Sequence, residues 1–178
     1  MANLTTLEKQ ILEKLFQMNG GYVLNFSDRT MGEFFRDDIG IDIYNKKYNK
    51  AWLIDIGDFD KIMSELSKDV DVSGVFITHY HHDHIFGINS LIQAFPNCNV
   101  YISENGVEGL YSDKVNLSYY YDEPIIFKGS EVNILRNCDR VLLFEDCFLE
   151  AISTPGHNWS CMTYKMNNYL FTGVELLT

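Results

Sequence analysis

The chain has 178 residues, of which 46% are hydrophobic and 14% aromatic, and this composition is typical of one folded domain or of one domain with a short appendage. Its 25 acidic and 14 basic residues give a formal net charge of −11, which disfavours contact with the phosphate backbone of nucleic acids. No run of about 18 apolar residues suggests a membrane span, and the polar start of the chain does not resemble a signal peptide, so we expect a cytoplasmic protein with no membrane association.

The first fifty residues are predicted to be mainly helical. Apolar residues recur at spacings of three and four between Leu4 and Met18, which is typical of one helix face, and two glycines follow that helix. A second, shorter helix is expected to end near Gly40. We therefore predict a helical N-terminal module or extension over residues 1–50 and a separate metal-binding domain over residues 51–178.

From residue 51 onwards, short apolar strands alternate with helices, and a run of strands alone then follows. The expected strands are 51–56, 73–78, 99–103, 141–144, 148–153, 162–166 and 169–172. The expected helices are 59–67, 85–95 and 104–111. This order predicts an α/β fold in which sheets and helices form layers. Three consecutive tyrosines, residues 119–121, are expected to pack under a loop rather than to line a pocket.

Four of the five histidines fall within six positions, in the sequence THYHHDH at residues 78–84. This segment follows an apolar strand and precedes a helix, and functional sites of α/β folds gather at such strand ends. Packing alone does not explain so many imidazoles, because burying them without partners would leave polar groups unsatisfied. Imidazole and carboxylate donors without cysteine suit zinc, iron or manganese.

The spacing within this segment indicates two neighbouring metal positions. In an extended turn, His79 and His81 project to the same side and can hold one ion. Asp83 and His84 lie at the start of the following helix and point to a second position, and paired metals lie about 3.5–4 Å apart. His82 occupies the position between these groups and is not expected to be a ligand.

Three motifs, in this order, resemble those of the metallo-β-lactamase superfamily. Residues 53–57 read LIDIG and are similar to the family's L-I-D-x-G strand end. Residues 78–84 contain the H-x-H-x-D-H signature, and residues 154–157 read TPGH, like the family's T-P-G-H element. The resemblance covers residues 51 to about 173, and it implies part of an αββα sandwich.

The resemblance also implies roles for individual residues. It implies five metal ligands, namely His79, His81, Asp83, His84 and His157. His79, His81 and His157 would hold the first metal. Asp55 would be a supporting carboxylate that fixes the orientation of the ligands. Asp83 and His84 are the implied catalytic residues, with Asp83 accepting a proton from the attacking water. The implied reaction is zinc-dependent hydrolysis of an ester, thioester, lactone or phosphoester bond in a small molecule.

The end of the chain departs from the family pattern. The family's F-T-G-D element reads FTGV here, so Val174 stands where an aspartate bridges two metals, and Glu175 would point to the opposite face of the strand. The chain also ends at Thr178, before the family's last strands and its final ligand histidine, which predicts a C-terminally truncated domain. We expect one firmly bound zinc (iron and manganese being alternatives), a second metal that is weak or absent, and an unpaired sheet edge that favours homo-oligomers.

The N-terminal fifty residues resemble a small module of bacterial abortive-infection proteins, which act in phage defence. The resemblance rests on GYVLNFS at residues 21–27, EFF at 33–35 and IDIY at 41–44. The alternative is an ordinary helical extension that packs on the sheet. A second functional hypothesis follows from this end and from Val174: a truncated, catalytically impaired metal-binding protein with a regulatory or interaction role.

Overall fold

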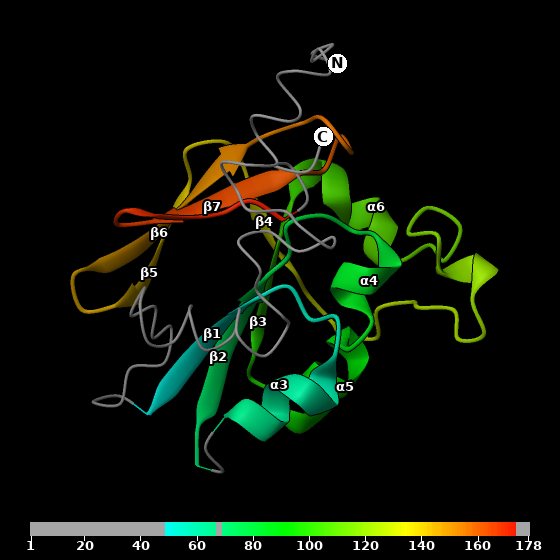
Figure 1. Ribbon diagram of the computed structural model, residues 1–178, viewed down its shortest axis with the longest axis horizontal. Helices are drawn as coiled ribbons and strands as arrows, with labels where there is room; N and C mark the ends of the chain where they lie inside the picture. Colours follow the sequence, from blue (N-terminus) through cyan, green and yellow to red (C-terminus); the bar gives the residue numbers. More distant parts are fainter. Residues whose placement is uncertain (1–48, 67–68, 174–178) are drawn as a thin grey trace, which may run out of the picture. The chain divides into compact units, whose positions relative to one another are not determined.

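Two four-stranded sheets and a set of short helices make up the described part of the chain, residues 49–66 and 69–173 of the computed structural model (Figure 1). The chain divides into two units, residues 1–42 and 43–178, and every described residue belongs to the second unit. The expected helical module over residues 1–50 therefore lies outside the described residues, apart from its last two positions.

The first sheet is parallel, and its strands lie side by side in chain order. They are β1 (Lys50–Ile54), β2 (Asp71–Phe76), β3 (Asn99–Ser103) and β4 (Asn133–Leu135). In the middle of this sheet Val75 and Phe76 are fully buried, as expected for a parallel sheet that is covered on both faces. Ile54 pairs with Phe76, and Phe76 pairs with Tyr101, so the carboxyl ends of β1, β2 and β3 lie at one edge.

The second sheet is antiparallel and is formed by the C-terminal part of the described chain. Its strands are β5 (Arg140–Phe144), β6 (Cys147–Ser153), β7 (Met162–Met166) and β8 (Tyr169–Phe171), in that order. Tight turns join β5 to β6 and β7 to β8. Asp146 and Asn167 in these turns have φ values of +62° and +53°, a left-handed conformation that short polar side chains tolerate. The local sequence therefore favours hairpins here.

Short helices cover one face of the first sheet. They are α3 (Phe59–Glu65), α4 (His82–Ile85), α5 (Ile88–Ala94) and α6 (Val107–Leu110), with the 3₁₀ helices η2 (Glu104–Gly106) and η3 (Ser118–Tyr120). Apolar side chains from all four α-helices pack with those of β2 and β3 in one core, in which Ile85, Ile88, Leu91 and Leu110 are fully buried. Among the described residues, no helix is both long and apolar enough to cross a lipid bilayer.

The opposite face of the first sheet packs on the second sheet through aromatic side chains. Phe76 stacks on Tyr101 with ring centroids 4.6 Å apart, and Tyr164 of β7 lies 5.4 Å from Phe76. The indole N–H of Trp52 donates to the carbonyl of Leu143 at 3.2 Å. The described residues thus form helix, sheet and sheet layers, three of the four layers of the expected sandwich, and the α/β class is confirmed.

The expected strands 99–103 and 162–166 coincide with β3 and β7, and the others differ by one or two residues at their ends. Residues 88–94 of the helix expected over residues 85–95 form α5, but Ile85 belongs to the separate helix α4. Helix α5 begins after Gly87, whose carbonyl accepts the N–H of Leu91 at 2.9 Å and whose own N–H donates to the carbonyl of Ile56 at 2.8 Å. Strand β4 was not predicted, since two of its three residues are exposed and carry no periodic pattern.

Candidate metal centre

The candidate site lies at the carboxyl ends of β1 and β2, which are neighbours because the two strands are parallel. Asp55 directly follows β1, and its N–H donates to the carbonyl of Phe76, the last residue of β2, at 2.9 Å. The histidine-rich segment begins two residues beyond β2. The strand pairing therefore places Asp55 beside the start of this segment.

The carboxylate of Asp55 holds the segment through three hydrogen bonds. Its Oδ1 accepts the N–H of Thr78 and its Oδ2 accepts the Thr78 hydroxyl, both at 2.7 Å. The same Oδ2 lies 2.7 Å from Nδ1 of His84. We call Asp55, Thr78 and His84 the Asp55 cluster. Asp55 itself has a φ of +59°, a left-handed conformation that costs about 1–2 kcal/mol and that these hydrogen bonds offset.

Gly57 allows the turn after β1 to approach helix α4 closely. A Cβ atom at Gly57 would lie 2.5 Å from the backbone oxygen of Asp83, a distance that real side chains do not reach. The N–H of Ile56 donates to the carbonyl of His84 at 2.8 Å, which fixes the same contact. The glycine of the LIDIG motif therefore has a steric role, since it brings Asp55 against the turn that carries His84.

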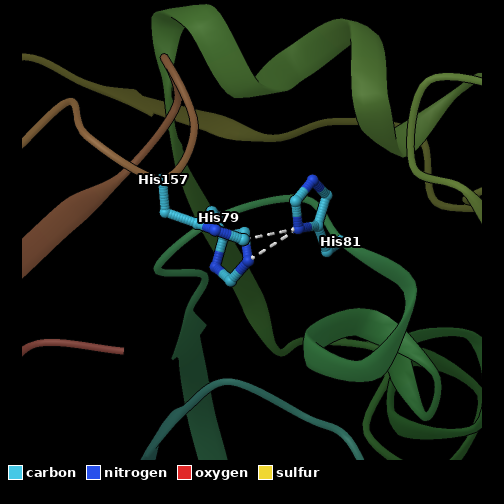
Figure 2. A group of neighbouring side chains, drawn as sticks. All are labelled: His79, His81 and His157. Carbon is cyan, nitrogen blue, oxygen red and sulfur yellow. Dashed lines mark hydrogen bonds between the residues drawn. The ribbon is translucent and has the colours of Figure 1, made fainter. Parts of the chain in front are cut away.

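His157 comes from the second sheet, on the loop that joins β6 to β7 (Figure 2). Strand β7 begins after this loop at Met162, whose N–H donates to the carbonyl of Thr78 at 2.9 Å. That hydrogen bond joins the second sheet to the first residue of the histidine-rich segment. His157 is thereby brought to His81, although 76 positions separate the two residues in the sequence.

Three imidazoles converge at this point: His79, His81 and His157, which we call the histidine triad (Figure 2). Nδ1 of His81 lies 3.1 Å from Nε2 of His79 and 2.9 Å from Nε2 of His157. One nitrogen from each ring lies within 4.8 Å of the other two. His79 is buried, His81 is half-buried and His157 is exposed, so the triad extends from the interior to the solvent.

Burial, together with the neighbouring imidazoles, lowers the pKa values of two triad residues, His79 and His81. Burial is the largest effect that lowers the pKa of His79, which falls from its ordinary 6.5 to about 3. Burial and then the charge that His157 would carry also lower the pKa of His81. Both rings are therefore neutral at neutral pH, and a neutral imidazole has one nitrogen lone pair that can bind a metal.

The donor set of the triad fits a divalent metal. Nδ1 of His81 faces two other ring nitrogens, and a single ring hydrogen can satisfy only one of these contacts. The Thr78 hydroxyl, which donates to Asp55, lies 3.3 Å from Nδ1 of His79 and can accept its hydrogen. Nε2 of His79 then carries the lone pair. Three imidazoles supported by a hydroxyl and a carboxylate are typical of a catalytic zinc site.

Asp83 and His84, the other two expected ligands, are not part of this converging group. The carboxylate of Asp83 is 62% exposed, and its Oδ2 lies 3.6 Å from Nε2 of His84. The ring of His84 lies beside that of His79, with centroids 4.1 Å apart. Burial lowers the pKa of His84, but the hydrogen bond and charge of Asp55, with the charge of Asp83, outweigh burial and raise it. The two residues therefore form a separate pair next to the triad.

His82 stacks on Tyr121, with ring centroids 3.8 Å apart and planes tilted by 24°. Residues 119–121 are 54%, 77% and 55% exposed, so the expectation that these tyrosines pack under a loop is wrong. The reason is that Asn116 and Ser118, both buried, fill the inside of this loop with hydrogen bonds to its backbone. The tyrosines are left on the outside.

Two residues that the sequence analysis did not single out contact the candidate site. Thr78 bonds Asp55, and the side-chain Nδ2 of Asn158 lies 3.2 Å from Nε2 of His81. The sequence indicates these two residues only by position, since Thr78 directly precedes the first motif histidine and Asn158 directly follows the last. Val174 and Glu175 lie outside the described residues, so the expectation about the bridging position stays a prediction.

A small cavity of about 130 Å³ opens beside the triad, and its lining consists of Pro155, Gly156, His157, Asn158 and Trp159. Trp159 is 80% exposed at its edge. Sites that enclose drug-sized ligands measure about 300–1,000 Å³, so this cavity can enclose only a small group.

The layered sheets and the triad at the strand ends define an α/β protein with a candidate metal site. The model of the metallo-beta-lactamase superfamily matches residues 47–173, which is most of the chain. The chain therefore belongs to the metallo-beta-lactamase superfamily, and the resemblance seen in its three motifs is confirmed.

Solved structures show the same fold. The BLEG-1 B3 metallo-beta-lactamase is 22% identical, with a TM-score of 0.63 over 72% of this chain and 63% of that one. ETHE1 from Myxococcus xanthus is 22% identical, with a TM-score of 0.51 over 72% and 48% of the two chains. TTHA1623 in a di-iron-bound form is 20% identical, with a TM-score of 0.53 over 67% and 59%. The chain thus spans less than two thirds of the length of each of these proteins.

Proposed function

We propose that the chain is a metal-dependent hydrolase and that its histidine triad holds one zinc ion. The convergence of three imidazole nitrogens from two different sheets carries this proposal. When bound, a divalent metal acts as a Lewis acid on a substrate oxygen and lowers the pKa of a bound water. Iron and manganese accept the same donors, and the di-iron-bound form of TTHA1623 makes iron the first alternative.

In this proposal, the residues around the triad orient its rings and move a proton. Asp55 acts through the Thr78 hydroxyl on Nδ1 of His79, and this contact sets which nitrogen of that ring faces the metal. Asp83 accepts the proton of the attacking water, for which its exposed carboxylate is accessible. His84 is fixed by Asp55, and its Nε2 lies 3.6 Å from the carboxylate of Asp83.

A second metal is proposed to bind weakly or not at all. Asp83 and His84 offer two donors among the described residues, whereas catalytic zinc sites have three protein ligands. Nδ1 of His84 is already held by Asp55, so only Nε2 remains as a donor. The triad is therefore the stronger of the two positions.

The proposed substrate is a small molecule with an ester, thioester, lactone or phosphoester bond. The cavity of about 130 Å³ beside His157 has room for the reacting group and leaves the rest of a substrate at the surface. Trp159, largely exposed at the cavity edge, offers an aromatic face to that remainder. A net charge of −11 disfavours a long polyanion in this position.

The test is to measure bound metal and hydrolysis in the same set of variants. The full chain is loaded with zinc, iron(II) or manganese(II), desalted and analysed for metal per chain. Turnover is then assayed on nitrophenyl esters, a thioester, a lactone and a nitrophenyl phosphodiester. We expect one zinc per wild-type chain, with both metal and turnover lost in His81→Ala and His157→Ala.

The matched control is His82→Ala, which removes an imidazole from the same segment. The His82 ring stacks on Tyr121 and is not part of the triad. This variant should keep its zinc. A wild-type chain that holds no transition metal, or triad variants that keep it, would contradict the proposal. One zinc without turnover on any of these substrates would favour the alternative of a metal-binding regulatory or interaction protein.

A further inference from the structure

The side chain of Asn158 bridges the backbone of its own loop and the ring of His81. Its Oδ1 accepts the N–H of Ser160 at 2.8 Å, and its Nδ2 lies 3.2 Å from Nε2 of His81. The first bond fixes the orientation of the amide, because a backbone N–H can only donate. With Oδ1 on Ser160, the group that faces His81 is the NH₂ donor.

This orientation determines where the neutral His81 ring carries its hydrogen. Nε2 must accept from Asn158 and therefore has the lone pair, so the ring hydrogen is on Nδ1. That hydrogen has an acceptor available, since Nδ1 lies 2.9 Å from Nε2 of His157. The hydrogen bonds around His81 are therefore consistent with one another in this single tautomer.

The same tautomer is the wrong one for holding a metal. Nδ1 of His81 is the ring atom that faces the other two imidazoles of the triad, whereas its Nε2 faces Asn158. To bind a metal through Nδ1, the ring must move its hydrogen to Nε2, where it would meet the NH₂ group of Asn158. Two donors would then face each other across 3.2 Å.

We infer that Asn158 is a positioning residue that holds His81 in the tautomer opposed to metal binding and thereby lowers the metal affinity of the triad. The inference rests on the proposed function, in that the triad is the metal site. Metal binding then requires the Asn158 amide to rotate, so that Oδ1 accepts from His81 and the N–H of Ser160 is released. The hydroxyl of Ser160 is buried without a hydrogen-bond partner in the described part of the chain.

The decisive substitution is Asn158→Asp, which keeps the shape of the side chain but has two acceptor oxygens. One oxygen can still accept the N–H of Ser160 while the other accepts a hydrogen on Nε2 of His81, so the metal-binding tautomer becomes the favoured one. Asn158→Ala removes the donor without adding charge. Asn105→Asp is the control for added charge, because Asn105 bonds the same loop, at the carbonyl of Trp159.

The first measurement is the tautomer of His81 in metal-free protein, read from long-range ¹H–¹⁵N correlations at a pH where the ring is neutral. We expect the hydrogen on Nδ1 in the wild type and in Asn105→Asp, and on Nε2 in Asn158→Asp. A purely structural role for Asn158 would not move this signal. A wild-type ring with its hydrogen on Nε2 would overturn the inference, and this result needs no metal to be bound.

The second measurement is zinc affinity by competition with a chromophoric chelator. Supporting residues of metal ligands change affinity by about 10–100-fold, and we expect Asn158→Asp to bind zinc about 10-fold more tightly than the wild type, with Asn158→Ala in between. The gain should persist in about 1 M salt, where charges are screened within about 3 Å. Asn158→Asp binding no more tightly than Asn105→Asp would overturn the inference. A wild-type chain without affinity for zinc would instead overturn the proposed function.

Discussion

The histidine triad and the Asp55 cluster lie side by side, yet the pKa values of His79 and His84 shift in opposite directions. In the triad the rings face one another, and burial lowers the pKa of His79 to about 3. In the Asp55 cluster burial also lowers the pKa of His84, but the carboxylate 2.7 Å away outweighs burial and raises it. A contacting carboxylate thus decides whether the pKa of a largely buried imidazole is lowered or raised.

The largest loss in the free energy of unfolding should come from removing the carboxylate of Asp55. In Asp55→Ala, the Thr78 N–H, the Thr78 hydroxyl and Nδ1 of His84 lose their acceptor. Unsatisfied buried groups cost about 1–3 kcal/mol each, and a nonpolar side chain remains in a left-handed conformation, so we expect a loss of about 3 kcal/mol or more. Urea unfolding of the metal-free protein measures this loss.

Asp58→Ala is the matched control for Asp55→Ala, because it removes the same charge from a helix cap outside the site. Asp58 accepts the N–H of Lys61 at 3.0 Å at the start of α3, and such caps are worth about 1 kcal/mol. Equal losses of stability in the two variants would show that the hydrogen bonds of Asp55 contribute no more than an ordinary helix cap. That result would contradict the claim that Asp55 determines the environment of His84.

The next largest loss of stability should come from filling the close contact between the turn after β1, which contains Gly57, and helix α4. In Gly57→Ala the new Cβ meets the backbone oxygen of Asp83 at 2.5 Å, and overpacking of this kind costs about 1–3 kcal/mol. Gly87→Ala should cost less, because the nearest contacts of the new Cβ, with Ile56 Cγ1 and Phe59 Cβ at 2.9 Å and the Phe59 backbone nitrogen at 3.1 Å, are longer than the 2.5 Å contact at Gly57. Urea unfolding ranks the two, and the reverse order would contradict the steric role of Gly57.

The two environments also predict opposite responses to pH in the metal-free protein. The folded pKa of His79, about 3, lies below its ordinary 6.5, so the unfolded chain binds more protons and stability falls as pH drops between these values. The raised folded pKa of His84 gives stability that is complete below the unfolded pKa and is lost as pH rises through the folded one.

Urea unfolding in the presence of a chelator, between about pH 4 and 8, tests both responses. The loss of stability at acid pH should be smaller in His79→Gln, and the loss with rising pH should be smaller in His84→Gln. An acid response that is unchanged in His79→Gln would show that the triad is not the group that titrates.

The smallest loss of stability is expected at the stacked pair of His82 and Tyr121, which lies outside the histidine triad and the Asp55 cluster. Tyr121→Ala removes the ring that stacks on His82 at 3.8 Å, and exposed aromatic pairs contribute about 0.5 kcal/mol. Tyr120→Ala, with a side chain that is 77% exposed, should change the free energy of unfolding less. Neither variant should alter zinc affinity, and a changed affinity in Tyr121→Ala would place His82 in the metal site after all.

Sequence reasoning succeeded where structure depends on neighbours along the chain. The buried strands β2 and β3 read as short apolar runs that end in polar residues, and the histidine-rich segment was recognisable because it follows one of them. Sequence reasoning failed where contacts with residues distant in the sequence determine the local structure. Helix α5 begins later than expected, after the turn in which Gly87 bonds Ile56, and residues 119–121 are exposed because polar side chains fill their loop.

By itself the sequence determined the fold class and the family, since strand patterns and motif spacings are local properties of the chain. Only the tertiary structure decided which nitrogen atoms meet, because His157 reaches His81 across 76 positions through the contact between two sheets. It likewise decided that His84 pairs with Asp55 and that Asn158 donates to His81. Hydrogen bonds act over about 3 Å, and separation along the sequence does not fix distances on that scale.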